Sequence, residues 1–283
     1  MNDRTQIGEY LRYDKLPLFW CPGCSDGIVL GAIVRSFAEL GLKKEEIVVV
    51  TGIGCWGKAD DYLGTHTLHV THGRALAFAT GVKAAKPELT VVALMGDGDC
   101  ATIGGNHFIH AARRNIGVTA IVVNNLNYGM TGGQYSATTP EGSSTSTSPL
   151  GSLEPAFDLC ELGKAAGAPF VARSTPYHIQ QLQGFIKEAI AKKGFGLVDV
   201  MSICPTHYGR RNQLATPVQM MEWLRDHAVT EKAYAALPTE EQAKVFTIGK
   251  FVDRERVDLS TKYAAPQDKA RQAKEKREGG AGR

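Results

Sequence analysis

Apolar residues up to about residue 210 follow two alternating patterns. Uninterrupted apolar runs, typical of buried strands, occupy Ile47–Val50, Thr90–Met95, Val118–Val123 and Gly196–Met201. Apolar residues at helical spacing occupy 27–41, Ala75–Ala85, Gly105–Asn115, 155–166 and 178–193. Strands that alternate with helices in this way indicate an α/β fold, with a mostly parallel sheet and helices on both faces.

Beyond residue 210 the pattern changes. Residues 217–246 predict two amphipathic helices, whereas 248–265 is polar with scattered apolar anchors and is predicted to be irregular. We therefore divide the chain into an α/β domain, residues 1–210, and a C-terminal helical or irregular arm, residues 211–283. The arm is expected to lie on a partner rather than to form a catalytic domain.

Composition sets broad limits on function. The chain has 283 residues, 43% of them hydrophobic, and a net charge of +3, so it can bury a full core. Its basic residues form no stripe with interleaved aromatics, and no run approaches the ~18 apolar residues of a membrane span. Neither nucleic acid nor a membrane is an expected partner. No secretory segment precedes residue 20, so a reducing cytoplasm is the expected compartment.

Polar side chains follow two of the predicted strands. Gly96-Asp97-Gly98 comes directly after one strand, and Asn124-Asn125 ends the next, with Asn125 28 positions beyond Asp97. A helical crossover of this length brings both side chains to the same edge of a parallel sheet, where such sheets bind ligands. Carboxylate, amide and main-chain oxygens suit Mg²⁺, which completes its shell with phosphate oxygens. This edge is therefore predicted to bind a diphosphate.

Four of the six cysteines lie beside Gly or Pro, in settings suited to tight ligand loops. Cys21 and Cys24 form a C-x-x-C loop, Cys55 follows a Gly-Ile-Gly turn, and Cys204 precedes Pro205. Such thiolates are compatible with structural zinc, a redox dithiol or a [4Fe–4S] cluster, and spacing alone does not separate zinc from a cluster. The other two cysteines fall in apparent helices and are expected to be small buried core residues: Cys100 and Cys160.

The residues around the polar strand ends extend the pattern. Gly96-Asp97-Gly98-Asp99 is followed by Asn124-Asn125-Leu126-Asn127-Tyr128-Gly129-Met130-Thr131-Gly132-Gly133-Gln134 and by Ser136-Ala137-Thr138-Thr139-Pro140. The spacing resembles the thiamin-diphosphate motif. The longer stretch resembles the β subunit of the 2-oxoacid:ferredoxin oxidoreductases, most of all the 2-oxoglutarate:ferredoxin oxidoreductases. The resemblance covers residues 17 to about 215 well and the arm poorly.

This resemblance implies a cofactor site and an iron–sulfur site. Asp97, Asn125 and the carbonyl of Asn127 would be the Mg²⁺ ligands. The cysteines that match the [4Fe–4S] ligands are Cys21, Cys24, Cys55 and Cys204. The residues expected to bind thiamin diphosphate are Cys55, His72, Gly96, Asp97, Gly98, Asp99, Asn125, Asn127, Gly129, Met130 and Thr131.

The resemblance also implies a reaction and partners. The enzyme would oxidatively decarboxylate 2-oxoglutarate with coenzyme A to succinyl-CoA and CO₂, or run the reverse carboxylation, with electrons passing through the cluster to ferredoxin. The chain encodes only the diphosphate half of a thiamin site, so an α subunit would supply the activating glutamate in a heterodimer or heterotetramer. Pyruvate or another 2-oxoacid is the alternative substrate.

The preference for 2-oxoglutarate rests on Lys58. This residue lies three positions after Cys55, on a loop expected to face the cofactor. Its cation would pair with the distal carboxylate of the substrate, and the Asn127 side chain would add a donor. The alternative for Lys58 is an ammonium group that reaches solvent.

Two further segments carry expectations. Residues 131–152 are rich in Gly, Ser, Thr and Pro, so Ser143–Ser148 is expected to be a flexible surface loop, while Thr131–Gln134 would pack around the diphosphate. His66, His69 and His72 are predicted to share one strand, with His66 and His72 on the same face, and zinc is not expected there.

Two rival functions remain open from the residues alone. A non-redox thiamin lyase or carboligase would use the Gly-Asp-Gly and Asn motifs but would not need four ligand cysteines. A zinc-stabilised binding subunit would use the cysteines but would bind no thiamin diphosphate. Each rival explains one motif set and leaves the other without a role.

Overall fold

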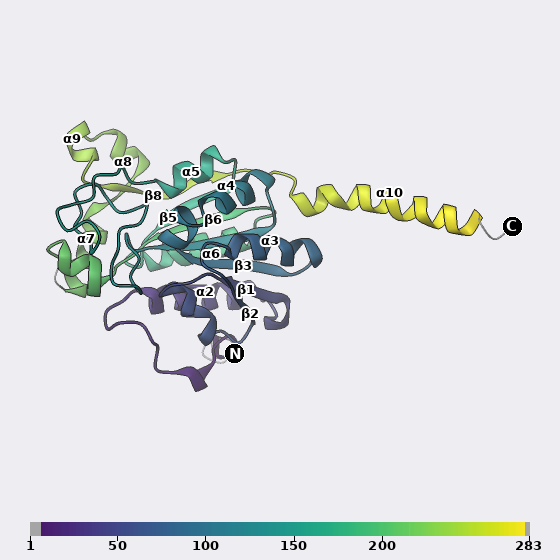
Figure 1. Cartoon of the computed structure of the whole chain (residues 1–283), viewed down its shortest axis with the longest axis horizontal. Helices are drawn as coiled ribbons and strands as arrows, with labels where there is room; N and C mark the ends of the chain where they lie inside the picture. The colour runs from purple at the N-terminus through teal and green to yellow at the C-terminus, as the bar shows by residue number, and fades with distance from the viewer. Residues whose placement is uncertain (1–6, 215, 281–283) are drawn as a thin grey trace.

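The computed structural model describes residues 7–214 and 216–280, and an eight-stranded sheet forms its centre (Figure 1). The strand order is β2-β1-β3-β4-β6-β5-β8-β7, and all pairs are parallel except β5 with β8. The strands are β1 (Ile47–Thr51), β2 (His66–His69), β3 (Thr90–Gly96), β4 (Val118–Asn124), β5 (Phe170–Ser174), β6 (Gly196–Met201), β7 (Ala228–Thr230) and β8 (Phe246–Asp253).

Helices cover both faces of the sheet, as predicted. The helices are α2 (Asp26–Glu39), α3 (Ala75–Ala85), α4 (Gly105–Arg114), α5 (Leu159–Ala165), α6 (Ile179–Ala191), α7 (Pro217–His227), α8 (Glu231–Ala235), α9 (Thr239–Gln242) and α10 (Leu259–Gly280). One core lies between the sheet and helices α2 and α6, and a second lies between the sheet and α3, α4 and α5. The central strands feed alternate residues to the two cores, which is why they read as continuous apolar runs.

The C-terminal segment differs from its prediction. Residues 217–246 contain α7, the short strand β7 and two short helices instead of two helices. The prediction that 248–265 is irregular is wrong, because β8 pairs antiparallel with β5 and α10 begins at Leu259. The sheet therefore extends past residue 210, and β8 belongs to the same body as the α/β domain.

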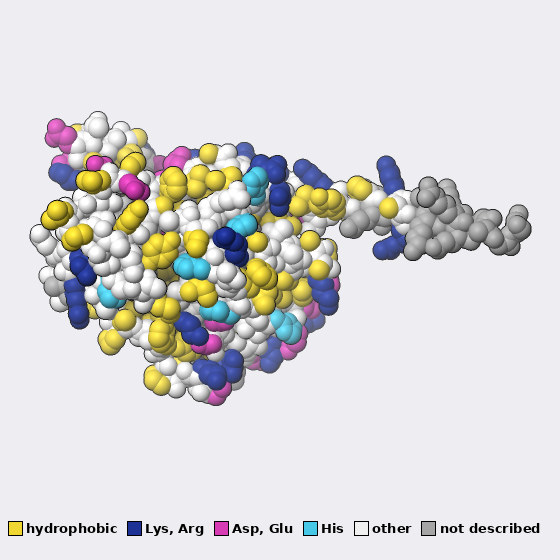
Figure 2. Space-filling model, viewed as in Figure 1, with side chains coloured by type: hydrophobic (Ala, Val, Ile, Leu, Met, Phe, Trp, Pro, Cys, Tyr) yellow, Lys and Arg dark blue, Asp and Glu magenta, His cyan; other side chains and the backbone are white. Residues whose placement is uncertain are grey.

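Helix α10 is the element that leaves this body. Figure 1 shows it projecting away from the sheet, and Figure 2 shows Lys and Arg side chains on its N-terminal part. The helix contains Pro266, and its first residues pack near Asn115, whose carbonyl accepts from the Leu259 amide at 3.0 Å. In the described parts of the chain, 7–214 and 216–280, no helix is long and apolar enough to cross a membrane. The polar residues 2–5, which supported the absence of a secretory segment, lie outside the described residues.

A buried network of charged side chains joins β5, β6 and the start of α5. Arg173 on β5 is 4% exposed and donates to Asp199 on β6 at 2.7 Å and to Asp158 at 2.6 and 3.1 Å. Asp158 in turn accepts from the amides of Cys160 and Glu161 and so caps α5. The network ties one helix to two strands, and each charge is stabilised only while its partner is present.

Replacing Arg173 should destabilise the fold strongly. Arg173→Met leaves Asp199 buried without a counter-charge, which should lower the free energy of unfolding by about 3–5 kcal/mol. Urea unfolding measures this loss, and adding Asp199→Asn should recover most of it. Lys187→Met, which breaks an exposed pair with Glu39, is the matched control and should cost at most about 1 kcal/mol. Equal losses in the two single variants would contradict this account.

Candidate functional site

The pairing of β3 with β4 places the polar motif at one edge of the sheet. Gly96 at the end of β3 stands opposite Val123 on β4, so Asp97 and Asn125 leave adjacent parallel strands side by side. A π-helical turn, Gly98–Thr102, follows Asp97. Leu126 takes a left-handed conformation, with φ of 66°, directly after Asn125. The sequence prediction that both side chains meet at this edge is confirmed.

Three oxygen-bearing groups meet at this point. The Asn125 side-chain amide lies 3.2 Å from Asp97 Oδ1 and 2.8 Å from the main-chain oxygen of Asn127. An amide nitrogen turned toward them donates to both oxygens, and an amide oxygen turned toward them completes a cluster of three acceptors. Asp97 is 1% exposed, and burial raises the pKa of its carboxyl group to about 6, against the hydroxyl donors of Ser136 and Thr138. A buried carboxylate beside two further oxygen acceptors is a suitable ligand set for a hard cation.

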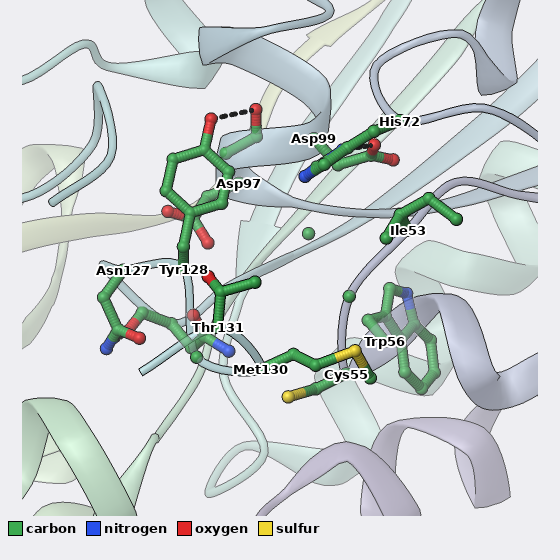
Figure 3. Close-up of a pocket in the computed structure, with 15 residues that line it drawn as sticks. Ile53, Cys55, Trp56, His72, Asp97, Asp99, Asn127, Tyr128, Met130 and Thr131 are labelled. Atoms are coloured by element: carbon green, nitrogen blue, oxygen red, sulfur yellow. Dashed lines mark hydrogen bonds and ion pairs between the residues drawn. The ribbon is translucent and has the colours of Figure 1, made fainter. Parts of the chain in front are cut away.

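These groups form part of a pocket, shown in Figure 3. The lining residues are Ile53, Gly54, Cys55, Trp56, His72, Gly96, Asp97, Gly98, Asp99, Asn125, Asn127, Tyr128, Gly129, Met130 and Thr131. This set contains all eleven residues that the resemblance assigns to cofactor binding. In Figure 3, Asp97, Asn127 and Tyr128 line one wall, His72 and Asp99 another, and Cys55, Met130 and Trp56 lie together.

The Asn127 side chain holds the neighbouring turn. Its Nδ2 donates one hydrogen bond to the Asn125 carbonyl at 3.1 Å, and the expected donation to substrate from the same amide group stays a prediction. Its Oδ1 is buried and accepts no hydrogen bond among the described residues. Asn127 therefore supports the oxygen cluster through its side chain as well as contributing its carbonyl.

His72 and Asp99 form a pair on the opposite wall. His72 Nδ1 hydrogen-bonds Asp99 Oδ1, which also accepts from the Gly73 amide at 2.6 Å. The Tyr128 ring meets the imidazole edge-on, with centroids 5.7 Å apart. The prediction that His72 shares a strand with His66 is wrong, because β2 ends at His69 and the chain turns before His72. That turn is what brings His72 into the pocket.

The four loop cysteines line a second pocket next to the first. Its other lining residues are Phe19, Trp20, Asn125, Gly129, Met130, Pro205, Thr206 and His207. Cys21 is exposed, Cys24 and Cys55 are half-buried and Cys204 is buried. Within 7–214 and 216–280, no three side chains of His, Cys, Asp or Glu are grouped closely enough to hold a single metal ion. Cys100 and Cys160 lie buried in the core, as predicted.

The two pockets share a wall. Cys55, Asn125, Gly129 and Met130 line both of them. A Cβ atom at Gly129 would lie 3.5 Å from Cys55 Sγ, 3.6 Å from Cys204 Sγ and 3.5 Å from Asn127 Oδ1, so both sulfurs face this glycine. Burial raises the pKa of Cys55 to about 12 and that of Cys24 well above its usual value. Thiolates form here only with a strong positive charge beside them.

Lys58 lies outside the cofactor pocket, contrary to the expectation from the sequence. It lies in a 3₁₀ helix, Trp56–Tyr62, and not in a loop, and it does not line the cofactor pocket. Its Nζ pairs with Asp61 Oδ2 at 2.6 Å, three residues further along the same helix. The lysine therefore has a carboxylate partner within this chain.

Several residues of the pocket and its surroundings were not predicted from the sequence. Trp56, Tyr128 and Ile53 line the pocket, and Ser136 and Thr138 hydrogen-bond Asp97 from the loop after the metal motif. Ser143–Ser148, expected to be a flexible surface loop, is attached to the domain: Thr145 is 1% exposed and the Ser144 amide donates to Asn212 at 2.8 Å. The Ser-x-Thr-Thr spacing within the recognised motif was the one sequence signal for this arrangement.

Comparison with known families and proteins places these features in context. Residues 44–200 match the model of the thiamine pyrophosphate enzyme, C-terminal TPP binding domain. The chain is 46% identical over 251 residues to the 2-oxoglutarate synthase subunit KorB of Methanothermobacter marburgensis, covering 89% of this chain and 88% of that protein. It is 50% identical over 224 residues to the KorB subunit of Archaeoglobus fulgidus, covering 79% of this chain and 82% of that protein.

A solved structure agrees with these sequence matches. It is the 2-oxoglutarate:ferredoxin oxidoreductase of Magnetococcus marinus with 2-oxoglutarate, coenzyme A and succinyl-CoA bound. The match has a TM-score of 0.82 and 29% identity and covers 93% of this chain and 90% of that chain. The mostly parallel sheet with helices on both faces is thus the fold of that oxidoreductase chain.

Proposed function

Because the chain belongs to the family of 2-oxoacid:ferredoxin oxidoreductase β subunits, among the thiamin-diphosphate enzymes, we propose that its two adjoining pockets hold Mg²⁺–thiamin diphosphate and a [4Fe–4S] cluster. The observation that carries this proposal is that the pocket of the Asp97, Asn125 and Asn127 oxygens adjoins the pocket of the four cysteines and shares a wall with it. A lyase would not need the cysteines, and a zinc-stabilised subunit would not need the oxygens. One enzyme that passes electrons from a thiamin adduct to a cluster needs both.

The oxygen cluster fits Mg²⁺ in its spacing. Metal–oxygen bonds of about 2.0–2.1 Å at right angles put neighbouring oxygens about 2.9 Å apart. The Asn125 amide meets its two neighbours at 2.8 and 3.2 Å, close to that value. We assign Asp97 Oδ1, Asn125 Oδ1 and the carbonyl of Asn127 as ligands, with the amide oxygen turned inward. Mg²⁺ would then leave its remaining positions to phosphate oxygens and water.

The cysteine pocket fits a cluster better than a single zinc ion. Four thiolates around one zinc would have to converge within the span of one tetrahedron. The four cysteines instead surround a shared cavity, and no three ligand side chains in the described residues converge at single-ion distance. An iron–sulfur cube is larger than one ion and accepts this wider arrangement. The iron charge also supplies what the raised thiol pKa values require.

The proposed net reaction joins 2-oxoglutarate and coenzyme A to give succinyl-CoA and CO₂, with one proton released and two electrons passed to ferredoxin, or runs in reverse. When bound, thiamin diphosphate supplies the carbon nucleophile for the 2-oxo group, and the cluster accepts electrons singly. This chain's residues bind and orient: Asp97 and Asn125 anchor the diphosphate through the metal. Trp56 and Met130 form apolar wall on the cysteine side of the pocket.

A second subunit completes the site in this proposal. No glutamate is among the residues that line the cofactor pocket in the described chain. Thiamin activation uses a carboxylate on the aminopyrimidine, so an α subunit would supply it, in a heterodimer or heterotetramer. A reducing, cytoplasmic location would keep the cluster thiolates intact. The isolated chain is expected to bind cofactor and lack turnover.

The relatives favour 2-oxoglutarate as the substrate. They include 2-oxoglutarate synthase subunits, and the Magnetococcus structure holds 2-oxoglutarate. Lys58 keeps the role of a candidate for the distal carboxylate, since exchanging the exposed Asp61 carboxylate for a substrate carboxylate would conserve its ion pair. Pyruvate has no second carboxylate to offer and would leave Lys58 with Asp61.

The function is tested first by colour and reduction. The chain co-expressed with its α subunit should contain iron and acid-labile sulfide. It should also absorb broadly at about 400 nm, as iron–sulfur clusters do. Under anaerobic conditions, 2-oxoglutarate with coenzyme A should bleach this band, and pyruvate should do so far less. A colourless active complex would support a lyase instead, and a colourless zinc protein would support a binding subunit.

Asp97→Asn should separate stability from cofactor binding. The pKa of the Asp97 carboxyl group is about 6 in the folded chain, and an unperturbed Asp has a pKa of about 3.9. The free energy of unfolding should therefore fall as the pH rises from about 4 to about 6, because the buried group then has to ionise. The cofactor-free variant should thus be roughly 2–3 kcal/mol more stable than wild type at pH 7 and equal to it near pH 4. Urea unfolding with and without Mg²⁺–thiamin diphosphate should show that only wild type gains stability from the cofactor. A variant that keeps that gain would remove Asp97 from the metal site.

Lys58→Ala should act on substrate binding in a selective way. Loss of a distal ion pair should raise KM for 2-oxoglutarate about tenfold or less and leave KM for pyruvate nearly unchanged. Steady-state kinetics of the αβ complex with both substrates measure this, and Lys44→Ala on the exposed 3₁₀ helix Lys44–Glu46 is the control. Equal changes with both substrates would exclude Lys58 from specificity.

A further inference from the structure

We propose that Ser136 and Thr138 are positioning residues that orient the Asp97 carboxylate for Mg²⁺, so that Oδ1 alone is presented to the metal. This inference rests on the proposed function, because it concerns the same diphosphate site. It adds two residues that reach the metal ligand from a loop 39 and 41 positions away along the chain.

Both hydroxyl groups bind the same carboxylate oxygen. Ser136 Oγ donates to Asp97 Oδ2, and Thr138 Oγ1 donates to that oxygen at 2.6 Å. The other carboxylate oxygen, Oδ1, faces the Asn125 amide at 3.2 Å. A carboxylate has about four acceptor positions, and two hydroxyl donors occupy those of Oδ2, whereas neither hydroxyl binds Oδ1 on the side of Asn125. The arrangement selects one-oxygen coordination over two-oxygen coordination by the same side chain.

The hydroxyl segment is itself held to both strand ends. Thr139 Oγ1 donates to the Leu126 carbonyl at 2.7 Å and accepts from the Ser136 amide at 2.8 Å. The Ala137 amide donates to Thr102 Oγ1, at the end of the turn that begins beside Asp97, at 2.9 Å. The segment 136–139 therefore bridges the residues after β3 and the residues after β4. It fixes the separation of the two ends that carry the metal ligands.

Burial makes these contacts consequential. Ser136 and Thr138 are 2% and 3% exposed, and Asp97 is 1% exposed, so water does not replace a lost donor easily. A hydrogen bond to a charged group contributes more than one between neutral groups. Removing one hydroxyl should leave Asp97 free to rotate, with either oxygen meeting the metal.

The test uses the αβ complex with its cluster oxidised, which is silent in electron paramagnetic resonance, and Mn²⁺ in place of Mg²⁺. The variants are Ser136→Ala, Thr138→Val and the two combined. At saturating thiamin diphosphate, each single change should weaken Mn²⁺ binding about tenfold, and the pair should weaken it further. The spectrum of the bound ion should also broaden or shift as its coordination changes. Thr138→Ser keeps the donor and should restore wild-type affinity.

Two comparisons separate positioning from a general structural effect. Thr145→Val removes another buried hydroxyl of the same loop, one whose hydrogen bonds stay within the loop, and should leave Mn²⁺ affinity unchanged. In an Asp97→Ala background, removing the two hydroxyls should cause no further loss. An equal loss in that background, or wild-type affinity in the double variant, would overturn the proposal. A wild-type complex that binds neither Mn²⁺ nor thiamin diphosphate would instead overturn the proposed function itself.

Discussion

The parallel pairing of β3 with β4 is the constraint on which the site depends. Because Gly96 stands opposite Val123, the register sets Asp97 level with Asn124, and Asn125 follows one residue later, where its side-chain amide lies 3.2 Å from Asp97 Oδ1. A shift of one residue would turn one of the two side chains away from the pocket, toward a helix layer. The cores on the two faces hold this register, since each central strand is buried on both sides. The proposed metal site would therefore depend on packing contacts far from it.

The same edge of the sheet also brings the two pockets together. Gly129 has no side chain where Cys55, Cys204 and Asn127 approach it, so the diphosphate pocket and the cysteine pocket are separated by little more than a backbone. A Cβ atom at this position would already be in van der Waals contact with both sulfurs, so a longer side chain would have to displace them or turn away. A short path between a thiamin adduct and a one-electron acceptor is what oxidative decarboxylation with ferredoxin requires. In the proposed function, the wall shared by the two pockets would bring the two reactive centres close together.

The parts of the fold that follow local patterns were predictable, and the parts set by distant contacts were not. Strands β3, β4 and β6 are buried on both faces, so their apolar runs marked them within a residue. Strand β5 carries the buried Arg173, and β8 carries Gly249 and Lys250, so neither shows a strand pattern. The meeting of Asp97 with Asn125 was predictable because both residues directly follow strands that pair in parallel. Ser136 and Thr138 were missed because their partner lies far along the chain, where no periodicity reports it.

The spread of the four loop cysteines along the chain has a consequence for synthesis. Cys21 precedes the first strand, and Cys204 follows β6, the last of the strands β1 to β6, whose pairings with one another are all parallel. A nascent chain emerging from the ribosome has no complete thiol set until nearly three quarters of it has been made (204 of 283 residues). The cysteines then meet only after β6 has inserted beside β4, a long-range step that is slow compared with helix formation. In the proposed function, iron would therefore be inserted late, after the domain has folded, because the order of the strands decides when the four cysteines meet.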